Sequence, residues 1–467
     1  MAQNFIGCDR DQELLLPPSL REWLPEGHLA WCVLESVDEL DLGAFYDAYR
    51  LDGHGRAAHD PAMMVALLIY GYATGVRTSR TIERHCHDDV AFRVITANQT
   101  PDHATIARFR ARHETAIAGL FGSVLELCAR AGMVEVGVVA VDGSKIAAAA
   151  THHATRTYRQ IAEEIVKEAG ELDAAEDELY GDARGDELPE GLRTATQRRA
   201  RLREARLALD AERAAEAKKV PRDRDERLEE CRTRLVEDWR LERRVEAEHE
   251  AWRAQGIASN GRRCMNAHAY RPAVLPDEPE GKINVTDPDS RNLKTTRGWV
   301  QGYNAQAVVT TNQIVIAAEI STESLDSPNL QPMIATARQE LEHAGITDRP
   351  GVVVADAGYW KNDAIEALVG QGIQTLIAPD ADRRKAPRPG RRGGLYDFTR
   401  RVLATDWGHE LYLKRQGSVE PVFGQIKANR HADRFLRRGR SAVRSEWRLL
   451  TATHNLLKLH KHQLAAA

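Results

Sequence analysis

The sequence has few cysteines and no long apolar run, and these shortages exclude several classes of protein. Its six cysteines lie far apart with no Cys-x-x-Cys pair, so we expect neither a disulfide framework nor a cysteine-type zinc site. The longest apolar run, residues 62–73, is too short to cross a bilayer. Residues 1–18 mix charged and apolar side chains, unlike a signal peptide. We therefore expect a cytoplasmic protein with reduced thiols and no membrane partner.

The composition is that of a globular protein with an uneven distribution of charge. Of 467 residues, 42% are hydrophobic and 29% are charged, which is typical of a folded chain of two or three domains. The net charge of −4 conceals a basic stretch, because residues 383–448 hold 18 Lys and Arg against 6 Asp and Glu. Clustered arginine indicates a confined site for a polyanion such as a phosphate backbone. Solvated charge on surface helices is the alternative.

The first 130 or so residues have a helical pattern. Helices are predicted at 61–75, 79–95 and 102–132. Asp102 follows a proline and suits a helix N-terminus. The helix that it begins presents three arginines, Arg108, Arg110 and Arg112. Several short helices with one arginine-lined helix are typical of a helix-turn-helix-like DNA reader, although any small all-α domain has a similar pattern.

Strand patterns begin after residue 134 and alternate with helices in the second half of the chain. Buried or hairpin strands are predicted at 136–141, 299–310, 314–320, 351–355 and 373–378. Helices are predicted at 329–344, 362–370 and 418–464, with a loop at 383–394. Between the first two strands, residues 151–280 hold 25 Lys and Arg and 30 Asp and Glu. That composition favours long solvated helices.

Two of the predicted strands end in an aspartate, Asp142 and Asp356. An acid at the carboxyl end of a central strand points into the crevice where open α/β sheets hold ligands. Two buried carboxylates repel each other unless a cation lies between them, so the pair indicates a divalent metal site. Oxygen ligands favour Mg²⁺, with Mn²⁺ as the alternative. Either aspartate taken alone is also explained as the cap of the turn or helix that follows it.

The third candidate acid, Glu420, lies in a helix with a clear buried stripe. Residues at helical spacing should form that stripe, namely Val419, Val422, Phe423 and Ile426. Glu420 lies beside the stripe, and Lys427 lies about 10 Å further along nearly the same face. In these positions the carboxylate could bind a metal and the ammonium could bind a phosphate. A surface helix that carries both charges is the alternative.

The order of these elements and several phrases of sequence resemble one family. The order of a helical domain, strand-Asp, hairpin, helix, strand-Asp, helix, strand and helix-Glu resembles a ribonuclease-H-like core. The phrases at 141–145, 302–306, 355–359 and 419–427 resemble those of DDE transposases from bacterial insertion sequences. Asp60-Pro61 and residues 101–105 with Phe109-Arg110 resemble the N-terminal domain of the same transposases.

The resemblance implies roles for particular residues. Asp142, Asp356 and Glu420 would be the catalytic triad and the metal ligands. Related transposases place a Tyr and an Arg before the Glu and a Lys seven residues after it, and Tyr412, Arg415 and Lys427 fill these DNA-contacting roles here. The spacing from Arg415 to Glu420 is one residue longer than the family pattern.

Trp360 follows Asp356 closely, so it is expected near the scissile strand. A base displaced from the duplex end could stack on its ring. The alternative is that the ring packs the next helix onto the sheet.

Together these patterns predict a metal-dependent DNA transposase. The expected fold is an α/β ribonuclease-H-like catalytic core with an all-α N-terminal domain and a long charged helical insertion. We expect a DNA-binding domain at 1–132 and a catalytic domain at 133–467, interrupted by the insertion at about 150–282. The resemblance implies double-stranded DNA of the element ends and the target as partners, with a homodimer in the DNA complex and a nucleoid-associated location. The alternatives are a catalytically inactive DNA-binding protein derived from a transposase, and a ribonuclease-H-like nuclease without strand transfer.

Overall fold

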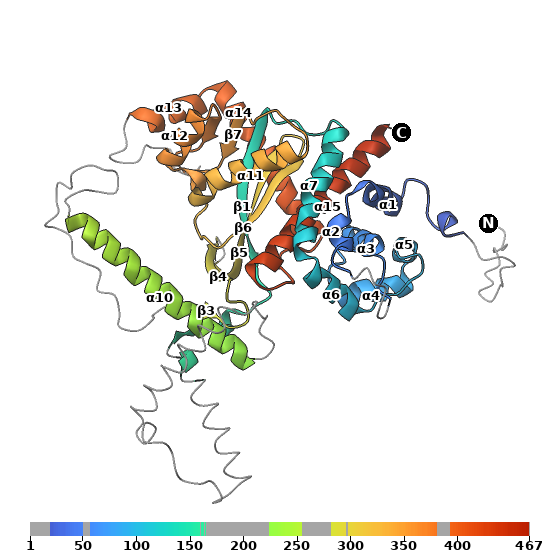
Figure 1. Ribbon diagram of the computed structural model, residues 1–467. Coiled ribbons are helices and arrows are strands. Elements are labelled where there is room, and N and C mark those ends of the chain that lie inside the picture. Colours follow the sequence, from blue (N-terminus) through green and yellow to red (C-terminus); the bar gives the residue numbers. More distant parts are fainter. Residues whose placement is uncertain are drawn as a thin grey trace, which may run out of the picture. The chain divides into compact units, whose positions relative to one another are not determined.

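The computed structural model describes residues 19–49, 57–158, 160–162, 164, 224–254, 282–295, 298–380 and 393–466 (Figure 1). The chain divides into two compact units, one formed by residues 1–150 with 289–467 and the other by residues 151–288. The predicted loop at 383–394 lies almost wholly outside the described residues.

The N-terminal part of the first unit is helical. Its helices are η1 (Leu20–Glu22), α1 (Leu29–Glu39), α2 (Gly43–Tyr46), α3 (Pro61–Thr74), α4 (Ser79–Asp88), α5 (Val90–Ile95), α6 (His103–Arg112) and α7 (Glu114–Arg130). Pro61 occupies the first turn of α3 and Asp60 caps it through the Ala62 amide at 2.9 Å. Almost every side chain of α3 is buried, so the longest apolar run of the sequence is the central helix of this region. No helix in the described ranges is long and apolar enough to cross a membrane.

Two predicted helices are each divided by a capping or packing residue. The predicted helix at 79–95 breaks at Asp89, whose carboxylate accepts from the amides of Ala91 at 2.8 Å and Phe92 at 3.1 Å. These bonds satisfy the free N–H groups at the start of α5, which favours a new helix. The predicted helix at 102–132 breaks at His113, which is buried. Asp102 caps α6 as predicted, accepting from the Thr105 amide at 2.7 Å.

The rest of the first unit is built on one mixed sheet. Its strands are β1 (Val138–Ala147), β4 (Arg291–Thr295), β5 (Gly298–Thr310), β6 (Val315–Ser321), β7 (Val352–Ala355) and β8 (Gln374–Ile377). The order is β4-β5-β1-β7-β8, and β6 also pairs with β5. β1 pairs antiparallel with β5 and parallel with β7, and β7 pairs parallel with β8. The predicted hairpin is therefore present as β5 and β6, and the other predicted strands are present too.

Strand β1 is longer than the apolar run that predicted it. The run 136–141 should end at Asp142, but β1 continues to Ala147. Its parallel pairing with β7 ends at the pair of Val141 and Ala355, while its antiparallel pairing with β5 continues to Ala147. Asp142 thus lies in the middle of a strand, at the point where one neighbouring strand stops. Backbone pairing with β5 on one side is enough to hold the polar residues 142–145 in extended form.

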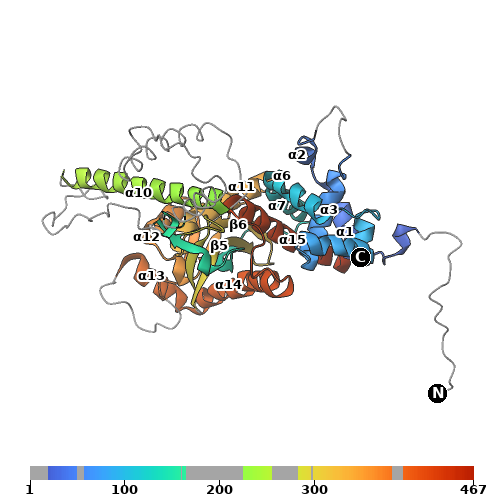
Figure 2. The same cartoon turned by 90° about the horizontal axis from the view of Figure 1, so that it is seen from below.

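Helices cover both faces of this sheet. They are η5 (Ser327–Asn329), α11 (Leu330–His343), η6 (Ala357–Tyr359), α12 (Asn362–Gly370), α13 (Gly394–Leu403), α14 (Asp406–Gly424), the π-helical turn η7 (Gln425–Asn429) and α15 (Arg440–Ala466). Figure 2 shows α14 and α11 on opposite sides of the strands. The predicted helix at 418–464 is thus divided among α14, η7 and α15, with non-helical residues at 430–439. Helix α15 packs on α7, α3 and β6 (Figure 1), so one apolar core extends from the N-terminal helices into the sheet.

The second unit contains a short two-stranded sheet and one long helix in its described part. Strands β2 (Thr155–Thr157) and β3 (Lys282–Asn284) pair antiparallel, after the turn η2 (His152–Ala154). Helix α10 (Arg224–Ala254) has 31 residues, in agreement with the predicted long charged helices. Its small apolar cluster joins α10 to β3 through Ile161, Leu228, Cys231, Leu235 and Ile283.

Candidate active site

The sheet brings Asp142 and Asp356 together. Val141 and Ala355 are paired across β1 and β7, and each aspartate is the next residue in its chain. Burial, and after it the nearby charge of Asp356, raises the pKa of Asp142 to about 7. Burial also raises the pKa of Asp356. The two carboxylates therefore form a pair that binds protons, or another cation, more strongly than exposed aspartates do.

Each aspartate is oriented by a backbone amide. The Gly143 amide donates to Oδ1 of Asp142 at 2.8 Å, and the Gly358 amide donates to Oδ1 of Asp356 at 2.8 Å. Gly143 also has no room for a side chain, because a Cβ there would lie 2.0 Å from Nε2 of Gln306. Both acids are thus oriented by amides close to them in the chain, with the second oxygen of each left for other partners.

Helix α14 carries Glu420 to this site as predicted from its buried stripe. Val419, Val422, Phe423 and Ile426 are all buried, and the Glu420 side chain is 52% exposed. Arg415 belongs to the same inward stripe, four residues before Val419, and its side chain is only 8% exposed. Because α14 packs on β1, this arginine is directed toward the acids.

Arg415 joins the third acid to the first. Its Nη2 lies 3.2 Å from Oε1 of Glu420, and its Nη1 lies 3.6 Å from Oδ2 of Asp142. Its guanidinium lies 5.7 Å from the ring centre of the buried Tyr412. The predicted group of Asp142, Glu420, Arg415 and Tyr412 is therefore contiguous, although Arg415 and Glu420 are one residue further apart than in the family pattern. Arg415 contacts both acids despite that extra residue.

Lys427 lies beside the strand that carries Asp142. Its Nζ donates to Oγ of Ser144 and lies 3.4 Å from the carbonyl oxygen of Lys145. Burial lowers the pKa of Lys427.

Helix α14 contains a proline, Pro421, directly after Glu420. Pro421 has no N–H to donate to the carbonyl oxygen of Gly417, and Nε2 of Gln313 donates to that oxygen instead, at 2.9 Å.

Sequence reasoning missed Asp326, which follows β6 and accepts three side-chain donors. Its carboxylate binds Nζ of Lys145 at 2.9 Å and 3.0 Å, Nδ2 of Asn304 at 2.7 Å and Nε2 of Gln306 at 3.1 Å. Its negative charge adds to the rise in the pKa of Asp356. Two amide side chains that alternate along a buried strand, Asn304 and Gln306, were the available signal, because they lie on one face.

Trp360 lies between the site and helix α13. Its ring is partly buried against the apolar core and meets Tyr396 edge-on, with ring centres 6.2 Å apart. Its Nε1 is buried and has no hydrogen-bond partner among the described residues. This placement resembles the packing alternative more than an open stacking platform.

The three arginines of α6 have different surroundings. Arg108 and Arg112 are exposed. Arg108 donates to its own helix at Ala104 and Thr105, and Arg112 lies over the Tyr49 ring. Arg110 is turned into the protein, where it donates to the Arg77 carbonyl oxygen at 3.0 Å and to the hydroxyls of Tyr72 and Ser79. Two of the three are thus free to meet a ligand from solvent.

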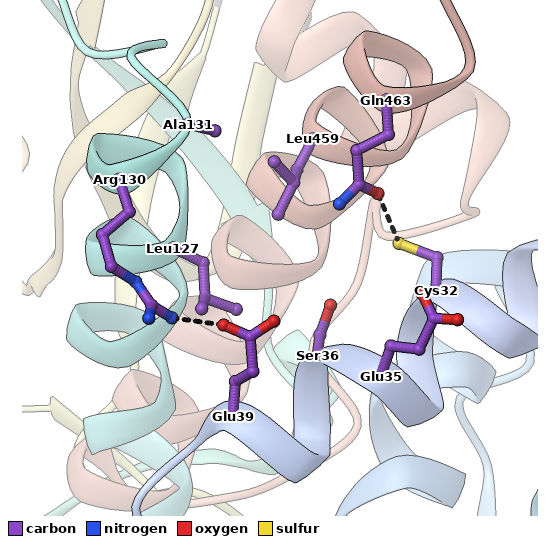
Figure 3. A pocket seen from close by; sticks show the side chains of 9 residues that line it. All are labelled: Cys32, Glu35, Ser36, Glu39, Leu127, Arg130, Ala131, Leu459 and Gln463. Atoms are coloured by element: carbon purple, nitrogen blue, oxygen red, sulfur yellow. Dashed lines mark hydrogen bonds and ion pairs between the residues drawn. The ribbon is translucent and has the colours of Figure 1, made fainter. Parts of the chain in front are cut away.

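A separate pocket lies among α1, α7 and α15 (Figure 3). It has a volume of about 240 Å³ and is lined by polar and apolar side chains, including Cys32, Arg130 and Gln463. Burial raises the pKa of the Cys32 thiol, and its Sγ donates to Gln463 at 3.5 Å. Arg130 pairs with Glu39 at 2.6 Å. The pocket thus contains none of the acids described above and no activated nucleophile.

Two family models match the chain. The Transposase domain (DUF772) model matches residues 18–112, and the Transposase DDE domain model matches residues 280–456. No curated protein and no solved structure matched. A helical N-terminal region followed by a mixed α/β sheet fits the transposase class. The chain belongs to the DDE transposases of insertion elements.

Proposed function

We propose that this transposase binds the ends of its element, cuts a DNA strand and joins the freed 3′ hydroxyl to target DNA. Asp142, Asp356 and Glu420 are its catalytic acids. The observation that carries the proposal is the meeting of Asp142 and Asp356 at the edge of β7, with Arg415 linking Asp142 to Glu420. Two acids from distant parts of the sequence meet there and Arg415 links a third to them, which a set of unrelated capping residues would not do.

We also propose that the catalytic part, 133–467 without the insertion, has a ribonuclease-H-like core. Its support is the order of elements along the chain: strand with Asp142, hairpin, helix, strand with Asp356, helix, strand and helix with Glu420. The mixed pairing, antiparallel for β1 with β5 and parallel for β1 with β7, is consistent with that order. The helices of residues 1–132 would be the DNA-binding domain.

The donor set fits Mg²⁺, with Mn²⁺ as the alternative. Carboxylate oxygens are the ligands that both ions prefer. The pKa of Asp142 is raised by burial and, after it, by the charge of Asp356, and a cation would offset that negative charge. Within the described ranges no three acid, His or Cys side chains are already grouped around one point, so Glu420 would have to approach the two aspartates. Asp142, Asp356 and Glu420 would hold a metal pair, which would serve to activate the attacking hydroxyl and stabilise the leaving 3′ oxygen.

The side chains around the acids would position the DNA. Lys427 would contact the phosphates that flank the scissile bond, since its ammonium lies beside the strand of Asp142. Arg415 and Tyr412 would approach the same DNA strand from α14. Exposed Arg108 and Arg112 would contact the element end in the N-terminal domain, and Arg110 would hold their helix in place.

A transposase of this kind joins two element ends to one target, which favours a homodimer in the DNA complex. Its substrate is double-stranded DNA, which places its action in the cytoplasm at the nucleoid.

The test uses duplexes made from the DNA that flanks the gene on each side. In Mg²⁺, the wild type should cut these duplexes and join the cut strand to a plasmid, and Asp142→Asn should bind the duplexes equally well without cutting. Binding without cutting by the wild type would instead identify an inactive DNA-binding protein. Cutting without joined product would identify a nuclease. Wild-type cutting by Asp142→Asn would refute the assignment of the acids.

A further inference from the structure

The segment that follows Lys427, residues 430–437, connects the candidate active site with the N-terminal helices. On one side it is bonded to β1, the strand of Asp142. The Ala147 amide donates to the Asp433 carbonyl oxygen at 3.2 Å, and the Phe435 amide donates to the Ala147 carbonyl oxygen at 2.8 Å. Any shift of this segment would therefore move the end of β1 and the turn that carries Lys427.

On its other side the segment is held by Arg77, from the loop between α3 and α4. The Arg77 guanidinium donates to the carbonyl oxygens of His431 at 2.6 Å and Arg434 at 3.1 Å. His431 has a φ of 51°, a left-handed conformation that is unusual for a residue other than glycine. A planar guanidinium can bind both carbonyl groups at once in a fixed geometry.

Glu446 completes this connection from helix α15. Its Oε1 lies 2.9 Å from Nη1 of Arg77, and its Oε2 accepts from the amides of Leu436 at 2.9 Å and Arg437 at 3.0 Å. The Arg77 side chain is 6% exposed and that of Glu446 is fully buried. Burying an ion pair costs desolvation energy that an apolar pair would avoid, so stability alone gives little reason for charged groups here.

The loop of Arg77 is in turn attached to the proposed DNA-reading helix. Arg110 of α6 donates to the Arg77 carbonyl oxygen at 3.0 Å. The loop also lies against the segment directly, since a Cβ at Gly75 would lie 3.3 Å from Cα of Arg430. A continuous path of hydrogen bonds thus runs from α6 through Arg77 to β1.

We propose that Arg77 is a positioning residue for strand cleavage. It fixes residues 430–437 to the N-terminal helices, so that DNA held by α6 meets Lys427 and the acids at one set distance. The inference rests on the proposed function, because it assigns Arg77 a role in that same reaction. In this role Arg77 acts through the segment that it holds, and not by contact with the DNA or with the catalytic acids Asp142, Asp356 and Glu420.

The variant Arg77→Lys tests this role, because lysine keeps the charge and loses the planar fork. Its matched control is Arg448→Lys. Arg448 has the same 6% exposure and is ion-paired with Glu340 at 2.6 Å, but it has no hydrogen bond to residues 430–437 among its contacts. Cleavage of flanking-DNA duplexes at saturating DNA should fall about 10- to 100-fold in Arg77→Lys, because a displaced reacting group loses its alignment. The dissociation constant should change less than about twofold. Arg448→Lys, at a temperature where both variants are equally folded, should cleave within about twofold of the wild type.

Hydrogen exchange of the backbone amides tests whether Arg77 holds the segment 430–437, and this test does not depend on DNA cleavage. The Phe435, Leu436 and Arg437 amides should exchange at least about tenfold faster in Arg77→Lys than in Arg448→Lys. If the wild type cleaves no duplex, the proposed function fails, and faster exchange still establishes that Arg77 holds the segment. Equal exchange in the two variants, or equal cleavage, overturns the inference. Should Arg77→Lys not fold, Glu446→Gln with Glu340→Gln as control makes the same comparison.

Discussion

The buried carboxylate of Asp142 should make the metal-free protein less stable than its own Asp142→Asn variant. Its pKa is raised from 3.8 to about 7, and at about 1.4 kcal/mol per pKa unit the ionised group costs the folded state about 4 kcal/mol. Asparagine has nearly the same shape and no charge. In EDTA at pH 8, the variant should therefore unfold with a free energy up to about 4 kcal/mol higher than that of the wild type.

The pH dependence of this difference follows from the direction of the pKa shift. A raised pKa means that proton binding to Asp142 favours the folded state. That contribution is complete below about pH 4 and is lost as the pH rises through about 7. The advantage of Asp142→Asn should therefore shrink to about 1.5 kcal/mol at pH 5 and vanish below about pH 4.

Urea denaturation of the metal-free protein at pH 8 and pH 5 measures both values, with Asp348→Asn as the control. Asp348 is an exposed carboxylate outside the site, so its replacement should change little. Saturating Mg²⁺ should reduce the difference in unfolding free energy between the variant and the wild type. A free metal concentration of about 100 times the Kd stabilises the wild type by about 2.7 kcal/mol. An Asp142→Asn protein no more stable than the wild type at pH 8 in EDTA would refute the account of burial and repulsion.

Three further changes test other parts of the site. Lys427→Ala should weaken binding of element-end and random DNA by similar factors and lower the salt slope of log affinity by about one; an unchanged slope in a salt titration would contradict a phosphate contact. Trp360→Ala should lower the melting temperature, with a loss of about 3 kcal/mol or less, because the ring packs on Tyr396; an unchanged melting temperature with slower cleavage would favour base stacking. Gly143→Ala should destabilise the folded protein, measured by urea denaturation, because its Cβ would overlap Gln306.

The sequence predicted those features that a local pattern of apolar residues marks. The hairpin at β5 and β6 and the strand before Asp356 follow from apolar runs, and the buried stripe around Glu420 follows from helical spacing; the structure confirms all three. Periodicity could not predict the extension of β1 beyond Asp142, because polar residues there are held by pairing with β5, a strand more than 150 residues later. The break at Asp89 was missed because a side-chain cap outweighed the helical pattern on either side.

The candidate site was predicted where residues belong to a known phrase and missed where they depend on tertiary contacts. Arg415 was predicted by resemblance, and its inward direction was also visible from its spacing before Val419. Asp326 was missed because no pattern in its own surroundings marks it, and only the folded chain brings it to Lys145 and Asn304. Arg110 resembled its exposed neighbours in sequence, and only its contact with the Arg77 carbonyl distinguishes it.

The pairing of β2 with β3 brings the two ends of the unit of residues 151–288 together, so the unit can be replaced as a whole. Thr155 pairs with Asn284, and the Val285 amide donates to the Ala154 carbonyl oxygen at 3.0 Å, so the chain enters and leaves this unit at adjacent points. Because the cost of closing a loop grows only slowly with its length, segments of very different size can join the same two ends. Related proteins could therefore gain, lose or exchange this unit without altering the sheet that bears the acids, and a short linker or a foreign domain could be grafted in its place.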